Sequence, residues 1–477
     1  MGDLHFGMVG FDMTPRFHPQ FGAWGTTASL TQLDMPLLGR CIALEQDGRR
    51  LIWFGLDLVG ETVPGTEAIR DELAATLGLE RDQIVWSTSQ THSGGALPGS
   101  IISGSSVTDL SQQDSDFVAA ERKRFMSCCT DAAREAIEHL QPVKIWAGHG
   151  FCDSMSYNRR LPMPTGGAKF SRNYREGLQG GKFFDTTIGL IRFEDTHGQT
   201  LGAIFNFGCH PATMIEADAL SPDWVGTARQ HVEEAIGGAP AMFSQGFCGD
   251  VNCYHIFGTP EQAKRTGARL GKAAAEAMAT LTPVRGEQFD YRVKRIELPC
   301  RPMYTRQELE RELAVRHDFL EELQIDPRVS WYGGYNLPEQ FSSQQKVAAV
   351  RLSIDYLEEG LRMLEAGEPV RSTLPLTLGA IRIGDVAAAY SPGENFTATG
   401  MRIRTRSPFT HTLICGDTNG LFGYIGDDAE IDRGGYETDS YWKMLFIDGF
   451  RLAPAKGAVD RIIEEGIALL GELHRGG

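Results

Sequence analysis

The sequence predicts an α/β protein of the layered α+β type, in which large mixed β-sheets are flanked by helices. Short apolar runs with the character of buried strands recur along the 477 residues. Several of these runs end in glycine-containing loops with polar side chains, a design typical of strand ends that bind a ligand. Two long charged segments near 301–370 have helical periodicity and predict a helical hairpin inserted into this framework.

The first third of the chain is predicted to alternate strands with helices. Strands are expected at 6–11, 40–44, 51–58, 83–86 and 143–149, and helices at 66–77 and 115–140. Asp57 lies inside an apolar run, where a buried carboxylate needs a partner. The usual partners are backbone amides or an arginine, and a bound metal is the alternative. The Gly- and Ser-rich stretch 94–109 fits a mobile loop beside a site or an ordinary surface connection.

The remaining two thirds continue this pattern and contain the inserted hairpin. A β-hairpin is expected at 184–193 and 200–207, further strands at 289–298, 374–383 and 386–390, and helices at 224–236, 260–281, 304–323, 344–364 and 441–470. Residues 331–335, between the two charged helices, fit a lid over a pocket or a turn. We therefore expect residues 1–477 to form a single domain with the helical insertion at 301–370 inside it.

Composition narrows the class of protein. Hydrophobic residues make up 42% of the chain and charged residues 23%, as in soluble globular proteins, and the net charge of −16 argues against a nucleic-acid partner. No apolar run reaches the roughly 20 residues that span a bilayer, and no signal peptide is visible. The nine cysteines are odd in number and irregularly spaced, which favours reduced thiols. These features predict a cytoplasmic protein with a small-molecule substrate, and a homo-oligomer is compatible with them.

Five apolar runs end in loops of one design, which contain glycine and one or two groups able to bind a metal or move a proton. The loops lie at 90–95, 208–211, 244–252, 391–394 and 416–424. Ligands bind outside the carboxyl ends of strands in layered sheets, so five such ends at one place would form an active site. Arg159 and Arg160 follow another short strand and fit either a solvated pair or a grip on an anionic group or developing oxyanion.

The donors in these loops suit a borderline cation such as Zn²⁺. A catalytic zinc needs about three protein ligands and an open position for water, which it activates near neutral pH. His210 is followed by a proline that stiffens its loop, and Glu394 follows Pro392 and Gly393. A single His or Glu at a strand end is also common as hydrogen-bonded scaffold, and no local HExxH signature exists.

Six motifs in a fixed order carry a resemblance to a known family. They are Thr-His-Ser-Gly at 91–94, Asn-Arg at 158–159, Asn-Phe-Gly-Cys-His-Pro at 206–211, Gly-Asp-Val-Asn at 249–252, Pro-Gly-Glu-Asn-Phe-Thr-Ala-Thr-Gly at 392–400 and Asn-Gly-Leu-Phe-Gly-Tyr-Ile at 419–425. The chain resembles the N-terminal catalytic domain of the neutral/alkaline non-lysosomal ceramidases, as a divergent bacterial-type member. The resemblance covers most of the chain except 301–370, and we expect the family's C-terminal immunoglobulin-like domain to be absent.

The resemblance implies a zinc site. In that family two His, one Glu and one Tyr bind zinc in an amidase site, and His210, Glu394 and Tyr424 match the second His, the Glu and the Tyr. The family's first zinc-binding His is Gln90 here, and Gln is a poor, neutral ligand. The metal site is therefore expected to use His92 instead, to bind through three protein groups and water, or to hold another divalent metal or none.

The resemblance also implies catalytic residues. His92 matches the second His of the family's His-Thr-His motif, which supports catalysis, and Arg159 matches the Arg of its Asn-Arg-Ser loop. Tyr436 falls where a second Tyr contacts the scissile amide. The family's activating Ser is Asn252 here, which cannot be deprotonated but can donate a hydrogen bond to an oxyanion. Metal-bound water is then the nucleophile, and His92 or Asp250 is the expected base.

The sequence therefore predicts a metal-dependent hydrolase, amidase- or esterase-like, that acts on an amide, ester or lactone bond of a small soluble substrate. Ceramide itself does not fit, because no membrane-docking segment is visible and the centre is altered. A metal-assisted isomerase or lyase of a polar small molecule is one alternative, since it needs no Ser. A metal-poor, non-catalytic binding relative is the other: Gln90 and Asn252 favour it, whereas His210, Glu394 and Tyr424 argue against it.

Overall fold

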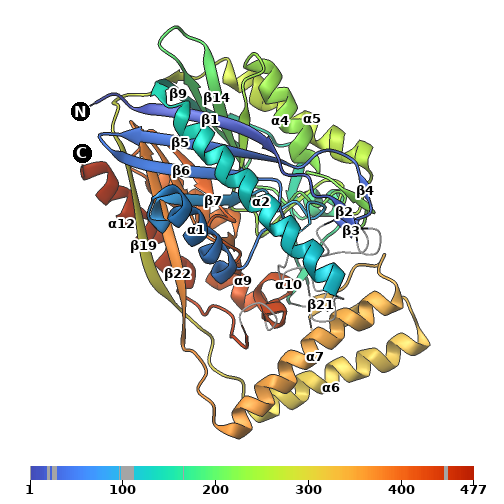
Figure 1. Ribbon diagram of the computed structural model, residues 1–477. Helices are drawn as coiled ribbons and strands as arrows, with labels where there is room; N and C mark the ends of the chain where they lie inside the picture. Colours follow the sequence, from blue (N-terminus) through green and yellow to red (C-terminus); the bar gives the residue numbers. More distant parts are fainter. Residues whose placement is uncertain are drawn as a thin grey trace.

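A computed structural model describes residues 2–18, 22–23, 30–95, 97, 112–164, 166–332, 334–444 and 449–476. Three β-sheets lie at its centre and helices cover them from outside, which confirms the predicted layered α+β class (Figure 1). Residues 98–109 of the Gly- and Ser-rich stretch lie outside the described residues, so neither expectation for that loop is tested.

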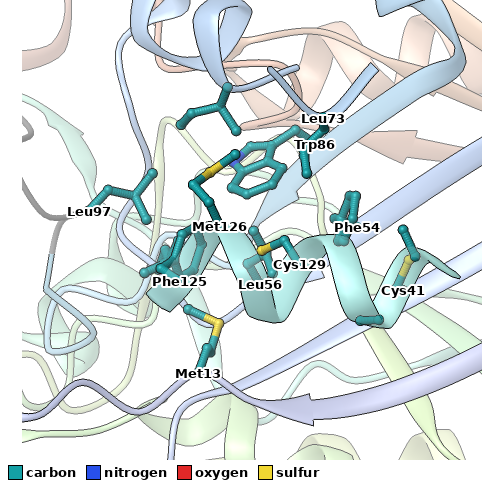
Figure 2. Close-up of a cluster of buried hydrophobic side chains, with 14 of the residues drawn as sticks. Met13, Cys41, Phe54, Leu56, Leu73, Trp86, Leu97, Phe125, Met126 and Cys129 are labelled. Atoms are coloured by element: carbon teal, nitrogen blue, oxygen red, sulfur yellow. The ribbon is translucent and has the colours of Figure 1, made fainter. Parts of the chain in front are cut away.

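The first sheet has the strand order β7-β6-β5-β1-β8. Its strands are β1 (His5–Asp12), β5 (Leu38–Gln46), β6 (Arg49–Leu56), β7 (Ile84–Thr88) and β8 (Gln141–Pro142). Helices α1 (Val63–Leu77) and α2 (Gln112–Glu138) cover one face of this sheet (Figure 1). Figure 2 shows the apolar layer between these helices and the sheet, where Phe125 and Cys129 of α2 face Phe54 and Trp86 of the sheet.

The second sheet has the order β16-β14-β13-β9-β18. Its strands are β9 (Lys144–Phe151), β13 (Thr187–Glu194), β14 (Thr200–Phe207), β16 (Ala241–Gln245) and β18 (Thr282–Pro283). The predicted hairpin is confirmed, since β13 and β14 pair antiparallel. Helices α4 (Trp224–Ala235) and α5 (Pro260–Met278) pack together on this sheet through an apolar cluster that includes Trp224 and Phe243.

The third sheet has the order β19-β22-β23-β25. Its strands are β19 (Phe289–Pro299), β22 (Thr373–Ile383), β23 (Val386–Tyr390) and β25 (His411–Cys415), and α8 (Thr397–Arg406) and α12 (Ala458–Arg475) cover it. The helix predicted at 441–470 is wrong in its first part: a short 3-10 helix spans Ser440–Met444, and α12 begins only at Ala458. Pro454 and two glycines with positive φ, Gly449 and Gly457, interrupt a continuous helix.

The three sheets share one central core. Apolar side chains from all three meet there, among them Phe6, Trp53, Phe193, Ile204, Ile381 and Leu413. Asp57 follows β6 directly, and both of its carboxylate oxygens pair with Arg229, at 2.9 and 2.7 Å. The structural reading of Asp57 is therefore the correct one. The nine cysteines form no disulfide.

The inserted hairpin near 301–370 is confirmed. Helices α6 (Arg306–Ile325) and α7 (Ser343–Ala366) pack against each other and project from one end of the molecule (Figure 1). Between them β20 (Trp331–Tyr332) and β21 (Tyr335–Asn336) form a small hairpin. Asn336 exchanges two hydrogen bonds of 2.9 Å with the backbone of Phe170, so this hairpin reaches the body of the protein. None of the described helices is long and apolar enough to cross a membrane.

Shorter elements connect the layers. They are β2 (Phe17–His18), β3 (Gly22–Ala23), β4 (Gln32–Leu33), β10 (Ser156–Asn158), β11 (Arg160–Pro162), β12 (Ala168–Phe170), β15 (Ala219–Leu220), β17 (Val251–Cys253), β24 (Gly393–Asn395), β26 (Gly423–Ile425), η1 (Arg81–Gln83), α3 (Tyr174–Gln179), α9 (Asp428–Arg433) and α10 (Tyr436–Asp439). Sequence periodicity does not reveal elements of this length.

Candidate functional site

The five loops expected to meet do meet. Each sheet contains one parallel pair, β6 with β7, β14 with β16 and β23 with β25, so their carboxyl ends point the same way within each pair. Backbone hydrogen bonds join the loops into a ring: His92 N to Pro211 O (3.0 Å), His210 N to Val251 O (3.2 Å), Gly249 N to Asn395 O (3.0 Å), Phe422 N to Pro392 O (2.8 Å) and Thr88 N to Asp417 O (3.2 Å).

The side chain of Gln245 connects several parts of this ring, and the sequence did not single out this residue. Its amide nitrogen donates to Ser89 O at 2.9 Å and to Cys209 O at 3.0 Å. Its amide oxygen accepts from the backbone nitrogens of Cys209 and Gly246. One fully buried side chain thereby fixes the first loop, the second loop and the end of β16 together. The only sequence signal was a polar residue that ends an apolar strand.

His210 and Glu394 lie against each other at the centre of the site. His210 Nε2 is 3.2 Å from Glu394 Oε2, and both side chains are buried. His210 Nδ1 lies 3.0 Å from Val251 O, and a carbonyl oxygen only accepts, so the ring hydrogen is on Nδ1. Burial and the charge of Arg159 lower the pKa of His210, which favours the neutral ring with a bare Nε2.

Gln90, expected at a metal position, contacts Glu394. Its φ of 61° is left-handed, an uncommon conformation for a residue other than glycine, at the start of the first loop. The Gln90 oxygen accepts a weak hydrogen bond from Cys248 Sγ at 3.5 Å, and its side chain hydrogen-bonds to the Glu394 carboxylate. Burial opposes ionisation of Glu394, whereas the hydrogen bond from Gln90 and the charge of Arg159 favour the carboxylate.

Tyr424 lies beside Glu394. β24 and β26 pair in parallel with these two residues in register, and the Tyr424 ring centroid is 6.4 Å from that of His210. Burial and the nearby Glu394 carboxylate raise the pKa of Tyr424, so its phenol is neutral in the absence of a cation. The structure thus brings the predicted imidazole, carboxylate and phenol into one place.

Arg159 and Arg160 are both buried, so the solvated reading of this pair is wrong. Arg159 Nε donates to Glu437 at 2.8 Å and Nη1 donates to Asn252 Oδ1 at 3.0 Å. Its Nη2 is buried without a hydrogen-bond partner. The guanidinium carbon lies 5.3 Å from the Tyr424 ring centroid. Nearby phenols and carboxylates raise the pKa of Arg159 despite burial, so one charged donor in the site is uncommitted.

Asn252 and Asp250 form hydrogen bonds with neighbouring groups of the site. Asn252 accepts from Arg159 and its Nδ2 donates to Ser171 O at 3.3 Å, so both ends of the amide are engaged. Asp250 accepts from Asn158 at 2.7 Å and from Thr397 N, the first residue of α8, at 2.8 Å. Burial raises the pKa of Asp250 to about 6. These contacts make both residues supports of the loop that carries Arg159.

His92 and Tyr436 lie at the edge of the site, and both are half-buried. The His92 ring centroid is 5.8 Å from that of His210. The Tyr436 ring is 5.8 Å from Tyr424 and meets Phe170 edge-on at 5.1 Å. Tyr436 also packs against the apolar cluster of the inserted hairpin, so α6 and α7 contribute to the wall of the site.

Two further acids of the site were missed from the sequence. Glu437 orients Arg159 and also pairs with Arg160, and its sequence context gave no signal. Asp417 follows β25, is held at φ 46°, and buries both carboxylate oxygens without a hydrogen-bond partner. Burial and the charge of Glu394 raise the pKa of Asp417. An acid directly after a buried strand was the available signal for Asp417.

Within the described ranges, no three His, Cys, Asp or Glu side chains cluster closely enough to hold a metal ion. The candidate donors are instead of four kinds: the imidazole of His210, the carboxylate of Glu394, the phenol of Tyr424 and the amide of Gln90. Two ligand atoms on one tetrahedral zinc lie about 3.3–3.4 Å apart, given bonds of about 2.0–2.1 Å. The 3.2 Å between His210 Nε2 and Glu394 Oε2 fits that spacing.

Solved structures resemble the whole chain. A ceramidase complexed with C2 has a TM-score of 0.66 at 18% identity over 99% of this chain and 76% of its own. The neutral ceramidase from Pseudomonas aeruginosa has a TM-score of 0.61 at 17% identity over 98% of this chain and 75% of its own. No protein-family model matches, and no curated protein matches. The chain therefore has a ceramidase-like fold over nearly its full length.

Proposed function

We propose that this chain is a metal-dependent hydrolase that cleaves an amide, ester or lactone bond of a small soluble substrate. The observation that carries the proposal is the 3.2 Å contact of His210 Nε2 with Glu394 Oε2. With the ring hydrogen on Nδ1, this contact joins two acceptors unless a proton or a metal cation lies between them. A buried acceptor pair of zinc-ligand spacing supports a cation there.

His210, Glu394 and Tyr424 are the residues that would hold the cation. A zinc ion bound to them would supply a Lewis acid for the substrate carbonyl and would make water a stronger acid. We assign Gln90 a different role from ligation, because its side chain is committed to Glu394 and Cys248. In this role Gln90 fixes the orientation of the Glu394 carboxylate, as supporting partners of metal ligands do.

Arg159 is the group that receives the substrate carbonyl. Its free Nη2 is fixed by the bonds that Glu437 and Asn252 make to the other guanidinium nitrogens. A donor held in place before the reaction stabilises the charge that develops on a carbonyl oxygen. Asn252, whose amide is occupied, acts through Arg159 and takes no part in the attack.

His92 is the proposed base. It is half-buried and its ring centroid lies 5.8 Å from that of His210, whereas both oxygens of Asp250 hold the scaffold. Water adds its oxygen to the carbonyl carbon as His92 takes a proton, and the C–N or C–O bond then breaks. His92 returns the proton to the leaving nitrogen or oxygen, so the step consumes one water and needs no other reactant.

Binding without hydrolysis is the second candidate. It is favoured by Gln90, whose amide gives Glu394 a neutral hydrogen-bond partner and so reduces the need for a cation. Metal content separates the two candidates, because a non-catalytic binding protein of this kind would carry no metal at the site.

The test combines metal analysis with a substrate panel. Protein purified without chelator is expected to retain metal and to hydrolyse at least one member of a panel of small amides, esters and lactones. His210→Ala is expected to lose both properties. His231→Ala, on the outer helix α4, is the matched control and is expected to keep both. Metal-free wild-type protein that gains no activity with Zn²⁺ or Mn²⁺ would overturn the proposal.

A further inference from the structure

A cavity of about 840 Å³ opens beside the site. Three segments contribute side chains to its lining: Phe170 and Arg172 between β12 and α3, Tyr254 and His255 after β17, and Trp331 and Asn336 of the helical insertion. Asn336 joins the first segment to the third through its two hydrogen bonds with the backbone of Phe170. The insertion thus contributes to the wall of this cavity.

Phe170 connects the cavity with the site. The guanidinium carbon of Arg159 lies 4.6 Å from the Phe170 ring centroid, and that of Arg172 lies 4.5 Å from the same centroid. The two guanidinium groups are therefore separated by one aromatic ring at most. Tyr436 meets this ring edge-on.

Arg172 is a cation of the cavity lining without an ion pair. Its Nη2 donates to the carbonyl oxygen of Asn336 at 3.1 Å, and it forms no ion pair with a described carboxylate. The other charged lining residues are accounted for. Lys169 pairs with Glu176 at 2.6 Å, and Glu339 is exposed to solvent. Burial lowers the pKa of Arg172 to about 10, so the guanidinium is still charged near neutral pH.

His255 also lines the cavity, and it does not compensate Arg172. Burial and the charges of Arg269 and Arg265 lower the pKa of His255, so its ring is neutral near neutral pH. Tyr254 stacks on Tyr174 at 4.8 Å and adds an aromatic wall without charge. The cavity therefore presents one half-buried cation without an ion pair, Arg172, beside the Lys169–Glu176 pair, the exposed Glu339 and aromatic side chains.

We propose that this cavity binds an anionic group of the substrate, a carboxylate or a phosphate, through Arg172. The planar guanidinium recognises both groups by paired hydrogen bonds, and partial burial strengthens such bonds relative to those in water. The inference deepens the proposed hydrolase function, since it places the substrate's charge one aromatic ring away from the bond that is cleaved. It also explains why a cation is retained on the wall of a cavity without a carboxylate partner.

The experiment measures binding rather than turnover. Full-length protein is titrated by calorimetry, at constant ionic strength and pH 7.5, with butyrate, butyl phosphate and butyramide. Butyramide matches butyrate in size and lacks the charge. We expect at least one of the two anions to bind about tenfold or more tightly than butyramide, as for hydrogen bonds to charged groups. The stronger of the two identifies the anionic group.

The variants locate the effect. Arg172→Gln is expected to abolish the preference for the anion, and Arg172→Lys, which keeps a charge and serves if the Gln variant does not fold, is expected to retain part of it. Arg175→Gln is the matched control, because Arg175 is an exposed arginine three residues further along the chain, in α3 and outside the cavity lining. Equal binding of all three compounds by the wild type, or an unchanged preference in Arg172→Gln, would overturn the inference.

The outcome is separable from that of the proposed function. An anion preference that depends on Arg172 in a protein with no hydrolase activity would support the anion site and contradict the proposed hydrolase function. Hydrolysis of neutral amides or esters without any anion preference would contradict the anion site and leave the proposed hydrolase function supported.

Discussion

Two buried pairs of polar side chains lie at strand ends, and they differ in how completely they are paired. Asp57 and Arg229 form two parallel hydrogen bonds, and Asp57 also accepts from Leu38 N. His210 and Glu394 instead bring together two atoms that are both acceptors when the ring is neutral. The first pair is complete without any ligand, and the second calls for a cation. Completeness of pairing, rather than burial, separates scaffold from site.

The adjacent arginines show the same difference within one loop. Arg160 donates from Nε to Glu430, from Nη1 to Glu437 and from Nη2 to the carbonyl oxygens of Glu430 and Gly434. Arg159 shares Glu437 with it but keeps Nη2 free. Residue type and burial are the same, so only the free donor marks Arg159 as the group that meets a substrate.

The largest expected effect concerns the complete pair. Arg229→Met leaves Asp57 buried and unpaired, which should lower the free energy of unfolding by about 3–5 kcal/mol. Urea denaturation measures the loss. Activity per folded molecule should stay at the wild-type level, and a stable but inactive Arg229→Met protein would break the distinction between scaffold and site.

Glu394→Gln tests the incomplete pair. The variant keeps the shape of the side chain but removes the charge that would hold the cation, so kcat/KM should fall about a thousandfold, equal to about 4 kcal/mol of transition-state stabilisation. Steady-state kinetics on a substrate found in the panel measure this. Stability should change little, because burial disfavours the lost charge whereas the Gln90 amide and the charge of Arg159 favour it; a large loss of stability with intact kcat/KM contradicts the assignment.

Arg159→Lys and Arg160→Lys sharpen the comparison of the two arginines. Arg159→Lys should lower kcat/KM about a hundredfold, the effect of losing one oxyanion donor. Arg160→Lys should mainly lower stability, because three of its nitrogens hold structural partners. Kinetics and thermal unfolding of both variants are the measurements, and equal effects of the two changes on kcat/KM would refute the contrast.

Asp250 gives a prediction on pH. Its pKa is raised to about 6 in the folded protein, so between about pH 4 and 6 the native state holds a proton that the unfolded chain has released. Asp250 therefore makes the free energy of unfolding fall as pH rises through this window, by up to about 3 kcal/mol, with no further change above it. Urea denaturation at pH 4, 5, 6 and 7 should show that Asp250→Asn removes this component; identical slopes for variant and wild type would contradict it.

Gln90→His carries the smallest expected effect. An imidazole at this position offers a stronger ligand than an amide, and His tolerates the left-handed φ found here. Metal affinity, measured by competition with a chelator, should rise about tenfold or more. Unchanged affinity would show that the Gln90 position does not face the cation.

The architecture could be predicted because long elements leave periodic signals. The apolar runs that became β6, β14 and β23 and the charged helices α6 and α7 were found close to their observed bounds. The helix predicted from 441 was wrong because glycines and a proline interrupt its first part. Elements of a few residues, such as β24 and β26, are made by pairing across the chain and leave no local pattern.

The site could be predicted in its residue types but not in its bonds. His210, Glu394 and Tyr424 were named from motifs, and the structure places them together. Gln90 was expected to be a weak ligand, whereas its side chain is bonded to Glu394. Such partners are set by loops that lie far apart along the chain, and Glu437, in contact with Arg159 across 278 positions, could not be inferred from spacing.

The metal content of protein purified without chelator tests the central claim most directly. Elemental analysis of the wild type should find about one equivalent of a divalent metal. The double variant His210→Ala/Glu394→Gln should retain less than about a tenth of it, because it lacks the imidazole and the carboxylate that would hold the cation. A wild type without metal that takes up none when Zn²⁺ is added, or a double variant that keeps its full metal content, would contradict the account.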